Sequence, residues 1–169
     1  IAAGGGAGVF VGVAGSVAIN LIENDVLAYV NGGTVTANDN ISILAASDNS
    51  ITAYAGSLGV GAVGLAGSVV VNTFDSVTRA YVIGATIAAR GNGGTIGVKS
   101  WSASNGSEVV QDIRGLAVVA TTDETVEVLS VSIAGGAVGV AGNVETTFVN
   151  DTTEAYLDNS QVNSAGNIG

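Results

Sequence analysis

Three stretches of this chain repeat one another with fixed internal spacing, and this repetition constrains the fold more than any other feature. The stretches read VAGSVAINLIENDVLAYV from Val13, LAGSVVVNTFDSVTRAYV from Leu65 and VAGNVETTFVNDTTEAYL from Val140. In each stretch a tyrosine follows fourteen residues after a glycine, and these pairs are Gly15 and Tyr29, Gly67 and Tyr81, and Gly142 and Tyr156. Copies that keep such spacing are typical of repeat architectures, in which each copy packs against the next.

The two intervals between the copies differ, being 52 residues and then 75 residues. We assign about three of the extra residues to a loop at Gly91–Gly94 and about twenty to the segment from Trp101 to Glu124. A solenoid absorbs such an insertion as one added coil. We therefore predict a single β-solenoid segment of a longer protein over residues 1–169. Its repeat copies would cover about 5–56, about 57–131 with one extra coil, and 132–169 as a partial copy.

Aliphatic residues alternate with small residues in every copy. Val9, Val11 and Val13 occupy odd positions, for example, and small residues such as Gly12 and Ala14 lie between them. Successive side chains of a strand point to opposite faces, so this alternation predicts strands. Turn residues such as Asn31-Gly32-Gly33 separate the runs. We predict an all-β chain whose coils of roughly 20–26 residues would make about seven to eight coils.

The same alternation leads to a prediction about the surface. If the Val and Ile side chains fill the interior, the small residues point outward and form a smooth face of low charge. This predicted interaction face consists of Gly12, Ala14, Ser16, Gly64, Ala66, Ser68, Gly139 and Ala141. Exposed apolar surface often marks an interaction site, so we expect either self-association through this face or its cover by another layer of the chain.

Composition excludes several classes of function. The chain has no His and no Cys, which excludes Ser-His-Asp catalysis, thiol catalysis and the usual zinc sites. Four cations in a chain of net charge −10 cannot form the basic face of a nucleic-acid-binding protein. Residues 1–22 carry no charge, but their glycines disfavour a helix and no Lys or Arg flanks them. We therefore predict no transmembrane span in this segment.

Several acidic and turn residues are candidate sites. Paired carboxylates near Arg114 would suit a β-helix enzyme acting on polysaccharides, and the candidate acids are Asp123, Glu124, Glu127, Asp151, Glu154 and Asp158. We interpret them as solvated edges and predict neither an enzyme nor a cofactor. Calcium stays open as an alternative at turns such as Asn38-Asp39-Asn40, although no EF-hand loop occurs. Gly59–Gly64 matches the dinucleotide fingerprint, but a strand pattern follows it, so we interpret it as repeat glycine.

Two further sets of equivalent residues have structural interpretations. Asn20 and Asn72 would form a ladder of side-chain hydrogen bonds, which Thr147 would interrupt in the third copy. Tyr29, Tyr81 and Tyr156 would either stack along one face or pack separately with free hydroxyl groups.

The copies have the form (V/L)AGSVxxNxxxxxTxAYV, followed by TVxA…N(I/V)S(I/V)xA. This pattern resembles the repeats of leukotoxin-like filamentous adhesins and haemagglutinin-like proteins, very large bacterial proteins secreted by the type V (autotransporter or two-partner) route. The resemblance implies a right-handed parallel β-helix stalk at the bacterial cell surface or outside the cell. It implies a rigid rod for adhesion that associates laterally or contacts a host or neighbouring cell. The third copy departs from the pattern at Glu145, Thr146 and Thr147. A carbohydrate-active β-helix enzyme and a membrane-active leukotoxin segment remain the alternatives, and the ligand is not indicated.

Overall fold

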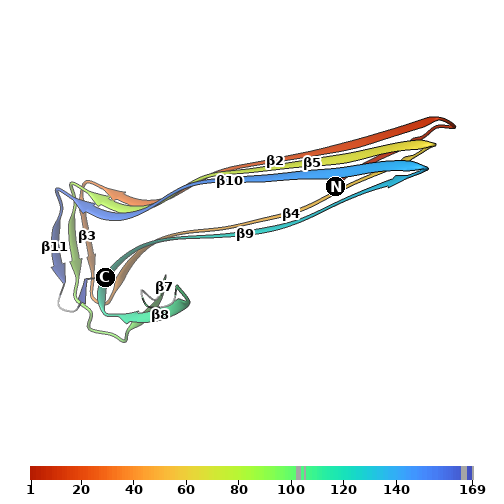
Figure 1. Ribbon diagram of the computed structural model, residues 1–169. Helices are drawn as coiled ribbons and strands as arrows, with labels where there is room; N and C mark the ends of the chain where they lie inside the picture. The colour runs from red at the N-terminus through yellow and green to blue at the C-terminus, as the bar shows by residue number, and fades with distance from the viewer. Residues whose placement is uncertain (102–103, 105, 165–166, 169) are drawn as a thin grey trace. The chain divides into compact units, whose positions relative to one another are not determined.

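The computed structural model describes residues 1–101, 104, 106–164 and 167–168, and the described residues contain no helix. The prediction of an all-β chain is confirmed. The strands, shown in Figure 1, are β1 (Ala2–Ala7), β2 (Val11–Asn31), β3 (Thr34–Ala37), β4 (Ile41–Val60), β5 (Val63–Ile83), β6 (Thr86–Ala89), β7 (Ile96–Trp101), β8 (Glu108–Ile113), β9 (Gly115–Gly135), β10 (Val138–Asp158), β11 (Gln161–Ser164) and β12 (Asn167–Ile168).

Parallel sheets take corresponding strands from the successive copies. One sheet has the order β1-β4-β9-β12, the second has the order β10-β5-β2, and the third has the order β11-β6-β3. Figure 1 shows β2, β5 and β10 running side by side, and likewise β4 and β9. Each copy therefore lies against the next copy, as the repeated sequence predicts.

The register of these sheets shows how much chain one rung of the stack uses. Thr34 pairs with Thr86, Ala2 pairs with Ala55, and Gln161 pairs with Thr86, so the partners are 52, 53 and 75 residues apart. Coils of roughly 20–26 residues, and hence about seven to eight of them, do not agree with this register. The reason is strand length: β2, β5, β9 and β10 each continue for 21 residues without a turn.

The extra residues of the second copy form a hairpin where we predicted an added coil. Strands β7 and β8 pair antiparallel, with Ile96 opposite Ile113. Ala89 still pairs with Ala37, 52 residues earlier, whereas the Gly115 N–H donates to the Asn40 side chain, 75 residues earlier. The insertion therefore lies between Ala89 and Gly115. A hairpin satisfies its own backbone hydrogen bonds, so the flanking strands stay in register without another rung.

The chain divides into two compact units, and the long strands contribute residues to both. The first unit contains residues 1–23, 49–75 and 124–150, and the second contains residues 24–48, 76–123 and 151–169, of which 102–103, 105, 165–166 and 169 are not described. Each unit is described by itself below.

Large aliphatic side chains fill the interior of the second unit, as predicted. Its core consists of Ile43, Ala45, Ala80, Val82, Ala85, Ile87, Ala89, Leu116 and Val118. These residues come from three different sheets, so the interior is enclosed on three sides. The β7–β8 hairpin adds a smaller cluster, in which Val98 and Ile113 pack with Ala117 of β9.

A column of tyrosines lies on the outer side of the second unit. The rings of Tyr29 and Tyr81 stack with centroids 5.2 Å apart, and the rings of Tyr81 and Tyr156 stack at the same distance. The spacing is close to the separation of neighbouring strands, so in-register pairing places the rings in contact. Of the two predicted arrangements, stacking is the one found, and each pair contributes about 0.5–1.5 kcal/mol.

The first unit has the opposite orientation of side chains from the one we predicted. Gly12, Ala14, Ser16, Gly64, Ala66 and Ser68 are buried between two facing sheets. Gly139 and Ala141 are exposed because β10 is an edge strand, although Gly139 also faces the backbone of Ala134 on β9. The outer side of β2, β5 and β10 carries the large apolar side chains, and we call this surface the valine face: Val11, Val13, Val17, Ile19, Leu21, Val63, Leu65, Val69, Val138, Val140, Val144 and Phe148.

Close approach of the two backbones explains this reversal. A Cβ atom on Gly64 would lie 2.5 Å from the carbonyl oxygen of Gly135, and one on Gly12 would overlap the carbonyl oxygen of Val60. Gly4 and Gly6 of β1 meet the backbone of β2 in the same way. Only small side chains fit beside these glycines, so Val11 and Val13 of β2 point outward there. Farther along the same unit the two sheets enclose a core in which Val70 and Phe74 pack with Ile51.

We predict that Gly64→Ala lowers the free energy of unfolding by about 1–3 kcal/mol, because the added methyl group meets backbone atoms that cannot move alone. Gly94→Ala is the matched control, since a Cβ atom there meets nothing within 4 Å. That variant should stay within about 0.5 kcal/mol of the parent chain or gain slightly. The measurement is the midpoint of urea unfolding, and equal midpoints for the two variants would contradict the close approach.

Candidate functional site

Polar side chains form columns between the rungs of the first unit. The Asn20 amide donates to the Asn72 side-chain oxygen at 2.7 Å, and the Asn72 amide donates to the Thr147 hydroxyl at 3.4 Å. The predicted ladder is therefore confirmed, but Thr147 extends it rather than interrupting it. These bonds fix neighbouring copies in one register and satisfy polar groups in the interior.

A second set of hydrogen-bonded polar side chains joins the two facing sheets of the first unit. Ser57 donates to Ser132 at 2.8 Å, Ser68 donates to Asn143 at 2.7 Å, and Ser132 also donates to Asn143. The first copy lacks this connection, because Gly4 occupies the register position of Ser57. The buried hydroxyl of Ser16 accordingly has no hydrogen-bond partner among the described residues.

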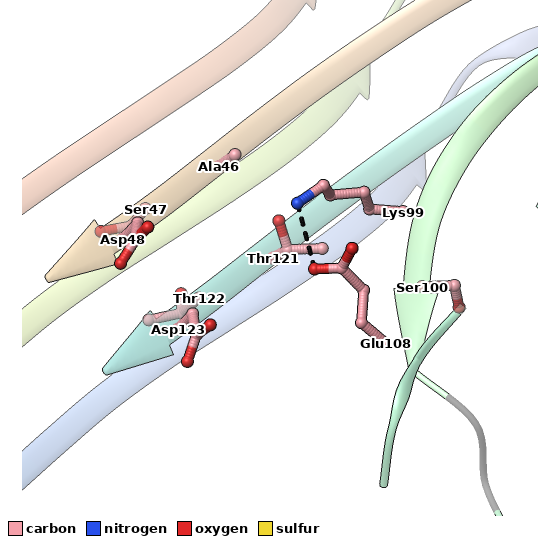
Figure 2. Close-up of a pocket in the computed structure, with 9 residues that line it drawn as sticks. All are labelled: Ala46, Ser47, Asp48, Lys99, Ser100, Glu108, Thr121, Thr122 and Asp123. Carbon is pink, nitrogen blue, oxygen red and sulfur yellow. Dashed lines mark hydrogen bonds and ion pairs between the residues drawn. The ribbon is translucent and has the colours of Figure 1, made fainter. Parts of the chain in front are cut away.

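A pocket of about 130 Å³ lies in the second unit beside the hairpin. Figure 2 shows its nine lining residues, which come from β4, from the hairpin and from β9: Ala46, Ser47, Asp48, Lys99, Ser100, Glu108, Thr121, Thr122 and Asp123. The Lys99 ammonium group lies 3.0 Å from the Glu108 carboxylate. The Lys99 and Glu108 side chains are 67% and 46% exposed, so this ion pair adds at most about 1 kcal/mol.

The pocket has an excess of negative charge. Asp48 and Asp123 occupy equivalent positions on the neighbouring strands β4 and β9, and Lys99, the one cation of the lining, is already paired with Glu108. Hydroxyl and carboxylate groups of this kind can form hydrogen bonds with a polar solute. Asp123 is one of the candidate acids of the sequence, but no sequence pattern indicates that the hairpin brings Lys99 and Glu108 beside it.

The remaining candidate acids lie in separate places. Glu124 accepts a hydrogen bond from Asn49 at 3.2 Å, and Glu154 forms an ion pair with Arg79 at 2.9 Å. Arg114 lies against Gly91, in the turn that precedes the hairpin. Within the part of the chain that the structure describes, no three acidic side chains are grouped closely enough to hold a metal ion.

The Asn- and Asp-rich turn of the first copy binds the corresponding turn of the second copy. The Asn92 amide donates to the Asn38 side-chain oxygen at 2.9 Å, and the Gly93 N–H donates to the Asp39 carboxylate at 3.0 Å. Asn40 donates to the Gly94 carbonyl oxygen at 2.7 Å. The Asn38 and Asp39 side-chain oxygens, which we considered as calcium ligands, thus accept hydrogen bonds that join two neighbouring copies. Gly59–Gly64 forms a strand, a turn and a strand, which fits the interpretation as repeat glycine.

Comparison with known proteins gives no match to a protein-family model, to a curated protein or to a solved structure. Among the described residues, no helix has the length and apolar character needed to cross a membrane. The functional argument therefore depends on the residues of this chain.

We predict that Ser68→Ala and Ser16→Ala differ in stability although both remove a buried hydroxyl group. Ser68→Ala should cost about 1–2 kcal/mol, because it removes a hydrogen bond to Asn143. Ser16→Ala should be neutral or stabilising, because burial of its hydroxyl costs desolvation free energy that no hydrogen bond offsets among the described residues. Chemical denaturation of both variants measures the difference, and an equal loss in the two would show that Ser16 is hydrogen-bonded after all.

Proposed function

We propose that this chain is a segment of a right-handed parallel β-helix whose role is structural, as the stalk of a large bacterial adhesin. The observation that carries the proposal is that every parallel sheet takes corresponding strands from successive copies. A stack of this kind grows by adding copies, and each added copy finds the same partner surface.

Side-chain contacts support the proposal because they also cross from copy to copy. The tyrosine column joins all three copies, and the ion pair of Arg79 with Glu154 joins the second copy to the third. The Asn150 amide likewise donates to the Asp75 carboxylate at 3.3 Å, across 75 residues. In such a stalk, backbone ladders and side-chain columns would transmit a load along the rungs, and the segment would hold distal domains away from the cell.

The repeat pattern supports the location and the partner class. Its resemblance to type V-secreted filamentous adhesins favours an extracellular or cell-surface protein that contacts a host cell or a neighbouring cell. We propose no catalytic role and no cofactor, because the acids considered for catalysis are dispersed over the described residues.

Electron microscopy of the parent protein tests the proposal. Rods of uniform width are expected, and compact particles would contradict it. Two assays on the same preparation test the alternatives: release of reducing sugars from bacterial and plant polysaccharides for the enzyme, and dye release from liposomes for the membrane-active segment. The stalk proposal expects neither activity, and a robust signal in either assay would replace it.

A further inference from the structure

The valine face of the first unit is unusual for a protein surface. Its twelve side chains have exposed fractions of 36–72%, which leaves on the order of 800 Å² of apolar surface on one side of one sheet. The largest apolar patch of a typical monomer is roughly 300–600 Å². A standard protein interface covers about 800 Å² on each partner. The face therefore has the area that a specific complex requires.

Charge is absent from this face although the chain carries a net charge of −10. The outward positions in 11–21, 63–73 and 138–148 contain no ionisable side chain. The first acids on the same side are Glu23 and Asp75, at one end of the face. Two copies that met with their strands antiparallel would keep these acidic ends apart, because the acids of one copy would lie at the opposite end from those of the other.

A row of glycines crosses the middle of the face. Gly15, Gly67 and Gly142 lie side by side on β2, β5 and β10, between one row of Val13, Leu65 and Val140 and another row of Val17, Val69 and Val144. A Cβ atom on Gly142 would meet nothing within 4 Å, and one on Gly15 would meet only the Gly67 carbonyl oxygen, at 3.8 Å. The packing of this unit thus needs its inward glycines, such as Gly12 and Gly64, but not this outward row.

We propose that the valine face binds the valine face of a second copy of this chain. The contact is self-complementary when its two-fold axis lies perpendicular to the strands, running from β2 across β5 to β10 between the Gly15 row and the Val17 row. Each glycine row then receives the valine row of the partner copy, with Gly15 opposite Val17, Gly67 opposite Val69 and Gly142 opposite Val144. Two sheets pack in this way about 10 Å apart, with interdigitated side chains.

A second copy fits this face better than a lipid surface does. The glycine rows and valine rows of the face are complementary in shape to those of another copy. The outward positions of the face include no Lys or Arg, which segments that bind at a membrane surface use to contact lipid headgroups.

The first test uses charge. Val140→Lys places an ammonium group on the face, and Val110→Lys is the matched control, because both valines are more than half exposed, at 58% and 65%, and Val110 lies on β8. We expect the parent chain to dimerise with a Kd below about 100 μM in sedimentation equilibrium. Val140→Lys should raise this Kd at least tenfold, and Val110→Lys should change it less than twofold.

The second test distinguishes an interface with shape complementarity from non-specific hydrophobic association. Gly142→Leu makes the face more apolar but fills the row that should receive Val144 of the other copy. Gly5→Leu is its control, since a Cβ atom at Gly5 also meets nothing within 4 Å and Gly5 lies on β1. Gly142→Leu should weaken the dimer at least tenfold while unfolding at the parent midpoint, and Gly5→Leu should leave the dimer unchanged.

Three results would overturn the proposal. These are a folded chain that stays monomeric at about 1 mM, equal effects of Val140→Lys and Val110→Lys, and a dimer that Gly142→Leu strengthens. Flotation with phosphatidylcholine vesicles tests the competing occupant: binding that Val140→Lys abolishes would assign the face to lipid. A monomeric chain from a rod-shaped parent would overturn the dimer and leave the stalk proposal intact.

Discussion

The close approach of two backbones in the first unit is the constraint on which the rest of that unit depends. Glycines in β1, β2, β4 and β5 bring facing strands so near that a Cβ atom at several of them would overlap a carbonyl oxygen. Beside these glycines only small side chains fit, and the alternating sequence then directs Val11, Val13 and Val17 of β2 to the outside. Farther along the same unit the sheets enclose Val70 and Phe74. The unusual surface of this unit is thus a direct consequence of its interior.

The second unit shows what the same strands do where a third sheet is present. Its interior is enclosed by three sheets and has room for Ile87, Leu116 and Val82, which are completely buried. The inward parity of β5 continues from Gly64 and Ala66 to Ala80 and Val82 without a change of phase. Both units share the in-register pairing of the copies, which aligns the tyrosines, the asparagine ladder and the turns that hydrogen-bond to each other.

Much of the fold was predictable from the sequence, because repetition and alternation are direct consequences of parallel pairing and of the pleat. The repeat intervals of 52 and 75 residues recur as the register of paired strands. The orientation of the strands was not predictable from alternation, which separates two faces without saying which is buried. Gly4, Gly6, Gly8 and Gly12 share the parity of Ala14, and such a run of glycines is a signal of close approach that could have decided it.

The coil length and the hairpin were not predicted, because residues typical of turns do not by themselves show whether a strand ends or continues. Asp48-Asn49-Ser50 has the composition of a turn, but Asn49 donates a hydrogen bond to Glu124 of the neighbouring strand and β4 continues through it. The sequence pair Asn105-Gly106 is a hairpin signal, and Gly106 has a φ of 66° between β7 and β8. The pocket beside Lys99 depends on that hairpin, so its lining could not be assembled from the sequence.

Nuclear Overhauser effects between backbone protons of the isotope-labelled chain test the central claim, that whole copies are the rungs of the stack. The account predicts cross-strand contacts that link 34–37 to 86–89 and 86–89 to 161–164, the parallel register found here. Contacts between strands only about 20–26 residues apart, the coil length of a short-coil solenoid, would contradict it.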